Sequence, residues 1–269
     1  MAHLFGFIGC GNMGGALARA VCRTVDPARV VLTNRTAAKA EALAAQLGCH
    51  TAPDNAAVAR EARFLFLGVK PQMMPGVLRD LAPVLAERSE PFVLVSMAAG
   101  LRMDRLLELA QGRYPLIRIM PNTPVAVGEG IILYTANELV SAADLDTFRA
   151  ALSAGGLLDP LEERLLDAGS AVAGCGGAFA DVFLEALADG AVACGLPRAQ
   201  AMRYAAQMLL GSARLALDSG RHPGALKDEV CSPGGSTIQG VRALERGGFR
   251  SAVFEAVTAA YEKTVELGK

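Results

Sequence analysis

A glycine-rich segment near the N-terminus limits the fold of this 269-residue chain more than any other feature. The pattern Gly-x-Gly-x-x-Gly occupies residues 9–14, between the short apolar run 4–8 and a helix-like segment. We expect Gly9 to form the turn, Gly11 to leave room for a pyrophosphate, and Gly14 to let the helix pack close to its strand. This arrangement between a strand and a helix is typical of a dinucleotide-binding fold.

Strand-like and helix-like segments alternate over the first 160 residues, and only helical patterns follow. Apolar runs typical of buried strands occupy residues 4–8, 30–33, 64–69, 92–96, 116–120 and 131–134. We therefore predict an α/β fold with two domains. Residues 1–160 form a Rossmann-type domain with a doubly wound, mostly parallel sheet, and residues 161–269 form an all-α C-terminal domain.

The long helical patterns in the second half, 178–194 and 199–217, are apolar around much of their circumference. A domain of about a hundred residues cannot cover such helices by itself. We expect a helical dimer interface, with a compact monomeric bundle as the alternative.

The composition excludes several classes of protein. Hydrophobic residues make up 52% and charged residues 20% of the chain, and the net charge is −1, which indicates a globular protein without a basic surface for nucleic acid or membranes. We see no signal peptide and no apolar run long enough to span a bilayer. The six cysteines and three histidines show no metal-ligand spacing, so we predict a cytoplasmic protein without a metal site.

The residues after the second predicted strand bear on the choice of cofactor. An NAD enzyme usually has Asp or Glu there, whereas this chain has Asn34, Arg35 and Thr36. Arg35 would attract a 2′-phosphate that a carboxylate would repel. We therefore predict NADPH, with NADH left open and with a solvated surface charge as the alternative role of Arg35. Lys70, after the third apolar strand, and Asn55, at a predicted helix start, are further candidates for cofactor contacts.

A second glycine turn lies near the other end of the chain. Residues 231–237, Cys-Ser-Pro-Gly-Gly-Ser-Thr, run directly into a helical pattern. We expect Ser236 or Thr237 to be the N-cap, and Gly234 and Gly235 to let the backbone approach a ligand. The unpaired amide groups of such a helix start suit a carboxylate or a phosphate.

The chain resembles the pyrroline-5-carboxylate reductase family along its whole length. The resemblance rests on residues 7–14, 69–71, 96–100 and 120–124 and above all on 226–238, the family's signature. It implies reduction of the cyclic imine 1-pyrroline-5-carboxylate to L-proline with NAD(P)H, the last step of proline biosynthesis. It also implies a Rossmann domain and a helical dimerisation domain, with dimers often assembled into rings.

The resemblance further implies roles for individual residues. The backbone of Gly234, Gly235, Ser236 and Thr237 binds the substrate carboxylate, with Ser232 in the same loop and Glu163 near the substrate. The Thr237 hydroxyl faces the ring nitrogen and is the catalytic candidate. The predicted cofactor-binding residues are Gly9, Cys10, Gly11, Asn12, Met13, Gly14, Asn34, Arg35, Thr36, Asn55, Val69, Lys70, Pro71 and Ala98.

Two segments depart from the family pattern. The usual Ser-Gly-Ser-Gly-Pro-Ala-Tyr is Ala-Gly-Cys-Gly-Gly-Ala-Phe at residues 173–179, and the usual neutral residue after Lys-Asp is Glu229. Two other functions stay open. A hydroxyacid dehydrogenase of related architecture would need a lysine on the first long helix, which offers Asp181 and Glu185 instead. A non-catalytic NADPH-binding protein is the other alternative.

Overall fold

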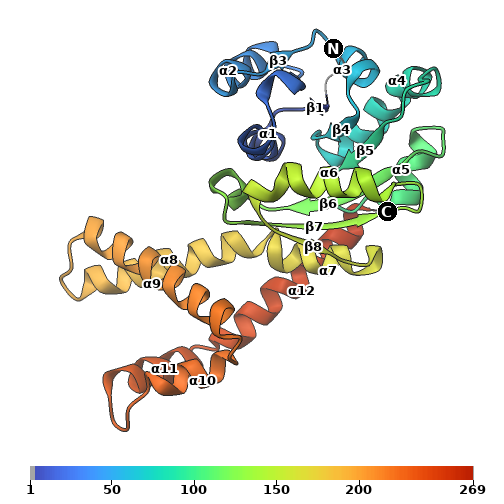
Figure 1. Ribbon diagram of the computed structural model, residues 1–269. Coiled ribbons are helices and arrows are strands. Elements are labelled where there is room, and N and C mark those ends of the chain that lie inside the picture. Colours follow the sequence, from blue (N-terminus) through green and yellow to red (C-terminus); the bar gives the residue numbers. More distant parts are fainter. Residues whose placement is uncertain (1–3, 269) are drawn as a thin grey trace. The chain divides into compact units, whose positions relative to one another are not determined.

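The computed structural model describes residues 4–268 and contains an eight-stranded sheet followed by a helical region (Figure 1). The strands are β1 (Phe5–Ile8), β2 (Val30–Thr33), β3 (His50–Thr51), β4 (Phe64–Leu67), β5 (Val93–Ser96), β6 (Leu116–Pro121), β7 (Gly130–Ala136) and β8 (Gly156–Pro160). Their order is β3-β2-β1-β4-β5-β6-β7-β8, and every neighbouring pair is parallel except β6 with β7. The predicted doubly wound, mostly parallel sheet is confirmed.

Helices cover both faces of the sheet because successive side chains on a strand point to opposite faces. Along β4, Phe64 and Phe66 join one hydrophobic core, whereas Leu65 and Leu67 join the other. The helices α1 (Asn12–Thr24), α2 (Ala37–Leu47) and α6 (Ala142–Leu152) complete the first core. The helices α3 (Asn55–Glu61), α4 (Met74–Ala86) and α5 (Met103–Leu109) complete the second.

The strand order reverses at β1, which pairs with β2 on one side and with β4 on the other. Two aromatic pairs fix the β1–β4 register: Phe5 stacks on Phe64 at 5.1 Å and Phe7 on Phe66 at 4.5 Å between ring centroids. The loops after these two strands therefore lie side by side. Open α/β sheets bind ligands at such a point, beyond the carboxyl ends of the strands.

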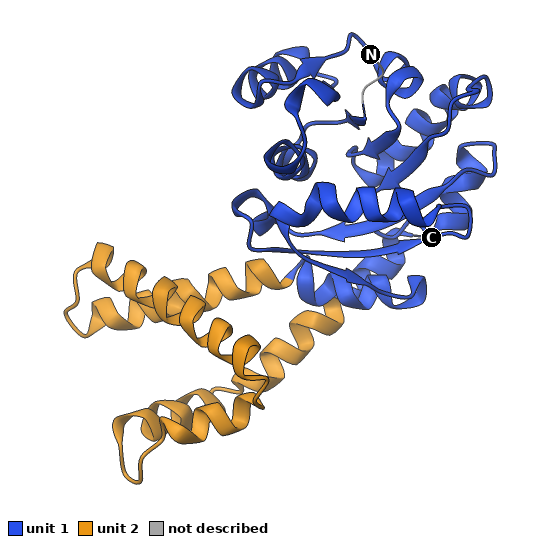
Figure 2. Cartoon of the chain, viewed as in Figure 1, with its two compact units in different colours: residues 1–175, 260–269 blue, residues 176–259 orange. Residues whose placement is uncertain are grey.

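The chain divides into two compact units (Figure 2). Residues 1–175 and 260–269 form the sheet unit, and residues 176–259 form the helical unit. This division differs from the boundary expected at residues 160 and 161, because α7 (Glu163–Ala173) packs on β6 and β7. That residues 1–160 bind the cofactor and residues 161–269 bind the substrate stays a prediction.

The helical unit contains α8 (Gly176–Ala193), α9 (Arg198–Ser219), α10 (Pro223–Glu229), α11 (Ser236–Arg246) and most of α12 (Phe249–Leu267). The described residues from 161 to 268 form no strand, as predicted. Only three residues are buried among residues 176–259, and all three are alanines: Ala188, Ala201 and Ala205. This unit therefore leaves most of its apolar surface uncovered within a single chain.

One helical stretch, Glu163–Ala193, is long and apolar enough by length and composition to cross a membrane. No such run was expected from the sequence. Only 11% of the apolar window is buried within the chain. Length and composition alone do not distinguish a membrane span from a helix that packs against another protein chain.

Candidate active site

The glycine loop between β1 and α1 has the open cradle that its sequence predicts. Gly9 has a φ of +98°, and its N–H donates to the carbonyl oxygen of Thr33 at 2.9 Å. Gly11 is the N-cap of α1 without a side-chain cap, and a Cβ added there would meet nothing within 4 Å. Because the first amide groups of a helix have no partner within the helix, this end of α1 fits a pyrophosphate.

The other glycines around this loop allow backbone to pack on backbone. A Cβ at Gly14 would lie against the carbonyl oxygen of Gly9, well inside van der Waals contact. A Cβ at Gly9 would lie 2.7 Å from the carbonyl oxygen of Gly68, the residue that follows β4. Gly9 and Gly14 are thus required by the fold itself, whereas the space beside Gly11 is free for a ligand.

Asn34 and Cys10 support the glycine loop from inside the protein. The Asn34 side chain accepts a hydrogen bond from the Cys10 N–H at 3.1 Å and donates one to the carbonyl oxygen of Thr36 at 3.1 Å. The Cys10 thiol donates to the carbonyl oxygen of Thr33 at 3.5 Å. Burial and the neighbouring Cys49 raise the pKa of the Cys10 thiol to about 12, so it stays protonated near neutral pH.

Arg35 and Lys70 are exposed and free to meet an anion. Arg35 follows β2, and Lys70 precedes the short turn Pro71–Met73 after β4. Within residues 4–268, neither side chain forms an ion pair or a side-chain hydrogen bond. Their position beyond the carboxyl ends of the strands agrees with the predicted cofactor contacts, which stay predictions.

The remaining predicted cofactor residues lie in the same sheet unit but differ in their surroundings. Ala98 is buried, and its N–H donates to the Ser96 hydroxyl at 3.4 Å. Asn55 is the first residue of α3, whose N-cap is Asp54, with an Asp54 oxygen 2.7 Å from the Ala57 nitrogen. Asn12 is exposed, whereas Met13 packs against the core. No ligand contact is assigned to these residues, and their roles stay predictions.

Residues 231–235, here called the signature loop, lead into a helix that has no side-chain cap. Gly234 has a φ of +70°, and the Gly235 N–H donates to the carbonyl oxygen of Ser232 at 3.0 Å. The helix α11 begins at Ser236, so the prediction that Ser236 or Thr237 is the N-cap is wrong: the cap is Gly235, in an extended conformation. Since glycine has no side-chain oxygen, no side chain satisfies the first amide groups of α11. The side chains of Ser236 and Thr237 are exposed.

Both halves of the chain match known protein families. The family model "Pyrroline-5-carboxylate reductase dimerisation" matches residues 163–267, and the model "NADP oxidoreductase coenzyme F420-dependent" matches residues 4–100. The pyrroline-5-carboxylate reductase of Escherichia coli is 41% identical over 275 residues, which cover 100% of both chains. The chain belongs to the pyrroline-5-carboxylate reductase family.

Solved structures of this reductase family have the same fold. The pyrroline-5-carboxylate reductase of Coxiella burnetii aligns with a TM-score of 0.88 at 31% identity over 100% of both chains. The pyrroline carboxylate reductase of Plasmodium falciparum, solved with NADP bound, aligns with a TM-score of 0.87 at 29% identity. That alignment covers 99% of this chain and 98% of the other.

Glu163, which the family resemblance places near the substrate, is tied to other residues of the sheet unit. Its Oε1 accepts a hydrogen bond from the Met103 N–H at 2.6 Å and lies 3.4 Å from Nη1 of Arg118. Arg118 is fully buried on β6 and also pairs with Asp167 at 2.6 Å. These partners support a structural role for Glu163, which joins the starts of α5 and α7 to β6. Its predicted contact with substrate stays a prediction.

The predicted residues of this reductase fall into two groups that belong to different units. The glycine loop, Asn34, Arg35 and Lys70 lie in the sheet unit, whereas Ser232 and residues 234–237 lie in the helical unit. Arg118 and Arg221 were not among the predicted residues, and the structure reveals their partners. For Arg118 a signal was present: a single arginine inside an apolar strand must find a partner when that strand is buried.

Proposed function

We propose that this chain reduces 1-pyrroline-5-carboxylate to L-proline with NADPH, as the last step of proline biosynthesis. The observation that carries the proposal is the signature loop, where the Gly234 turn leads into the uncapped start of α11. This loop occurs in a chain that is 41% identical to the E. coli reductase along its whole length. The fold is that of the reductase family, and the loop is the proposed site for the substrate.

The sheet unit has the residues to hold the cofactor. The open cradle at Gly11 and the first amide groups of α1 would bind the pyrophosphate, with the Cys10 N–H already held by Asn34. Arg35 is free to bind a 2′-phosphate, which favours NADPH over NADH. When bound, the nicotinamide supplies the hydride. The protein must orient the two reactants, because positioning is the main requirement for hydride transfer.

The helical unit has the residues to hold the substrate. The first amide groups of α11 would bind the carboxylate of the imine, with the backbone turned toward it at Gly234 and Gly235. The Thr237 hydroxyl would hydrogen-bond to the ring nitrogen. A protonated imine is already a strong electrophile, so this hydroxyl needs only to orient the substrate and assist proton transfer.

A Thr237→Ala variant is expected to keep the fold and lose most of the activity. Its side chain is exposed and caps no helix, so its removal should change the melting temperature little. Loss of one hydrogen bond to the substrate should lower kcat/KM by about tenfold to hundredfold. The measurement is the decrease in NADPH absorbance with 1-pyrroline-5-carboxylate, with L-proline quantified as product.

The control for this variant is Thr147→Ala, which removes a hydroxyl that bonds only within α6, to the carbonyl oxygen of Ala143 at 2.8 Å. It should leave the rate unchanged. The same assay with NADH measures the cofactor preference. A wild-type chain that binds NADPH and never oxidises it with this imine would disprove the proposed reaction and leave a binding role. Oxidation of a small hydroxyacid with NADP instead would support the related dehydrogenase class.

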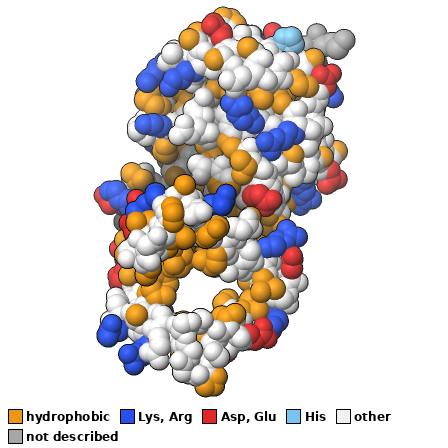
Figure 3. Space-filling model, turned by 90° about the vertical axis from the view of Figure 1, so that its left-hand side faces the viewer, with side chains coloured by type: hydrophobic (Ala, Val, Ile, Leu, Met, Phe, Trp, Pro, Cys, Tyr) orange, Lys and Arg blue, Asp and Glu red, His pale blue; other side chains and the backbone are white. Residues whose placement is uncertain are grey.

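We also propose that the chain is a cytoplasmic homodimer that associates through its helical unit. Figure 3 shows apolar side chains gathered over these helices and lining a hollow between them. Large apolar side chains of α8, α9 and α12 are exposed within the single chain, among them Val182 at 67%, Leu210 at 57% and Phe254 at 72%. Contiguous apolar surface of this kind is typical of obligate protein interfaces. The six cysteines are free thiols, which suits the reducing cytoplasm.

Introducing a charge on this surface should weaken the dimer. Phe254 on α12 and Val127 in the sheet unit are both 72% exposed, which makes them a matched pair. Phe254→Glu is expected to shift the light-scattering mass toward one chain, whereas Val127→Glu should leave it at two chains or a multiple of two. A monomeric wild type at micromolar concentration, or equal effects of the two changes, would contradict the proposed interface.

A further inference from the structure

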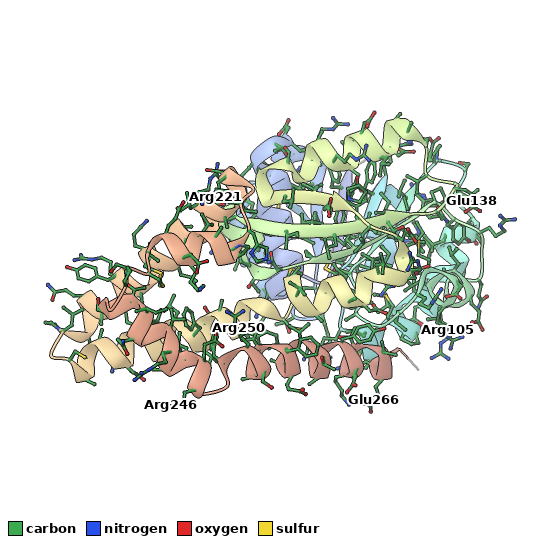
Figure 4. All side chains as sticks on the ribbon, turned by 90° about the horizontal axis from the view of Figure 1, so that it is seen from below. Arg105, Glu138, Arg221, Arg246, Arg250 and Glu266 are labelled. Atoms are coloured by element: carbon green, nitrogen blue, oxygen red, sulfur yellow. The ribbon has the colours of Figure 1, made fainter. Side chains whose placement is uncertain are left out.

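Arg221 and Glu229 form a bidentate ion pair directly before the signature loop. Arg221, labelled in Figure 4, lies between α9 and α10, and Glu229 is the last residue of α10. Nη1 of Arg221 lies 3.0 Å from Oε2 of Glu229, and Nη2 lies 2.5 Å from Oε1. The pair therefore runs along the whole of this seven-residue helix, from the residue before its N-cap to its last residue. Glu229 is also one of the departures from the family pattern named above, which has a neutral residue after Lys-Asp.

The segment between Glu229 and α11 is folded tightly. The N–H groups of Val230 and Cys231 donate to the carbonyl oxygens of Lys227 and Asp228 at 3.2 and 3.1 Å. The turn at Gly234 then brings the chain to the first amide groups of α11. Glu229 therefore precedes Ser236, the first residue of α11, by seven residues of chain that is folded by turns. Within a Debye length, about 8–10 Å at physiological salt, the potential of one charge is not fully screened.

The other charges around this segment are also paired. Lys227 lies 2.6 Å from Asp228, and Arg250 lies 2.7 Å from Glu245. Hydrogen bonds from Arg221 lower the pKa of the Glu229 carboxyl, so this group is ionised at neutral pH. An ionised Glu229 without Arg221 would be a free negative charge beside a site for an anion.

We infer that Arg221 is a positioning residue for substrate binding: it neutralises and fixes Glu229, so that an anionic substrate can enter the signature loop. The inference rests on the proposed function, because the anion in question is the carboxylate of the imine. Both side chains are about half exposed, 45% for Arg221 and 58% for Glu229. Exposed ion pairs contribute little to stability, so the variants that test the inference should fold.

The test compares Arg221→Gln, Glu229→Gln and the double variant in the full chain. Arg221→Gln is expected to raise the KM for 1-pyrroline-5-carboxylate about threefold to tenfold, with kcat within about twofold and a smaller effect at high salt. Glu229→Gln removes the negative charge and should stay within about twofold of wild type. The double variant should behave like Glu229→Gln. Arg105→Gln, which breaks the exposed Arg105–Glu108 pair in the sheet unit, serves as the control.

A second readout does not depend on catalysis. Cys231 follows Glu229 by two residues and is partly exposed. The thiol can be alkylated by iodoacetate, which is anionic, or by iodoacetamide, which is neutral. The ratio of these two alkylation rates reports the local potential, because a change in the thiol pKa alters both rates equally and cancels in the ratio. We expect this ratio, measured by peptide mass spectrometry, to fall about threefold in Arg221→Gln and to recover in the double variant.

The outcomes separate the inference from the proposed function. If the wild type does not reduce the imine, the proposed function fails, and the alkylation ratio still decides whether Arg221 controls the potential at the loop. If the double variant is as impaired as Arg221→Gln in KM and in the alkylation ratio, Glu229 is not the charge that Arg221 controls, and the inference is wrong. Equal losses of kcat and thermal stability in both single variants would likewise overturn it in favour of a purely structural pair.

Discussion

Replacing Gly14 by alanine is expected to destabilise the sheet unit, whereas the same change at Gly11 should leave the fold intact and weaken cofactor binding. At Gly14 the new methyl group would collide with the Gly9 carbonyl oxygen, which belongs to the backbone and has no rotamer to change. Such overpacking typically costs about 1–3 kcal/mol. At Gly11 the methyl group would meet no protein atom within 4 Å and would occupy the space proposed for the pyrophosphate.

Two measurements distinguish these effects. Thermal unfolding without cofactor should show a lower melting temperature for Gly14→Ala and an unchanged one for Gly11→Ala. Titration with NADPH should show an affinity lowered at least about tenfold for Gly11→Ala, since close approach of the backbone to the pyrophosphate is lost.

The control is Gly76→Ala in α4, where the new Cβ also meets nothing within 4 Å. Alanine in a helix interior is better than glycine by up to about 1 kcal/mol, so this variant should be slightly more stable and bind NADPH normally. Normal NADPH affinity in Gly11→Ala would show that the cofactor does not occupy this cradle.

The fold was predictable where one segment carries its own signal. Buried parallel strands are nearly continuous apolar runs, and the predicted strand 30–33 has the same bounds as β2. The two-residue, exposed β3 and the seven-residue helices α3 and α10 have too few residues to show a period. The strand and α10 were therefore not predicted, and only the start of α3, at Asn55, was. The glycine turns at Gly9 and Gly234 were also predictable, because a positive φ is a local requirement.

The interactions around the candidate site were not predictable, because they join residues that are distant in the chain. Asn34 was predicted as a cofactor contact, which stays a prediction, and the structure shows that its side-chain oxygen accepts a hydrogen bond from the N–H of Cys10, 24 residues away in the glycine loop. Glu163 and Asp167 reach Arg118 from 45 and 49 residues further along the chain. No local pattern specifies such pairs, so the sequence could indicate that a buried charge needs a partner without indicating which residue supplies it.

Replacing Arg118 by methionine is expected to be among the most destabilising single changes in the sheet unit. The Arg118 side chain is fully buried and is held by Glu163 and Asp167, whose side chains are 19% and 20% exposed. Methionine fills much of the same volume but leaves two neighbouring carboxylates without their cation. Breaking a buried ion pair from one side typically costs about 3–5 kcal/mol, because the remaining charge is uncompensated. The measurement is urea unfolding at a fixed protein concentration, since association affects apparent stability.

The triple variant Arg118→Met, Glu163→Gln, Asp167→Asn decides why the single change is harmful. It removes all three charges and keeps the hydrogen bond that the Glu163 side chain accepts from the Met103 N–H, because the glutamine carbonyl oxygen can replace the carboxylate. If uncompensated charge is the cause, the triple variant should recover most of the lost stability, as apolar replacements of buried ion pairs often do. The control is Arg113→Met, which breaks an ion pair with Glu138 whose side chains are 83% and 73% exposed; this should change stability by less than about 1 kcal/mol. An Arg118→Met variant as stable as the control would mean that α7 does not depend on this cluster for its attachment to β6.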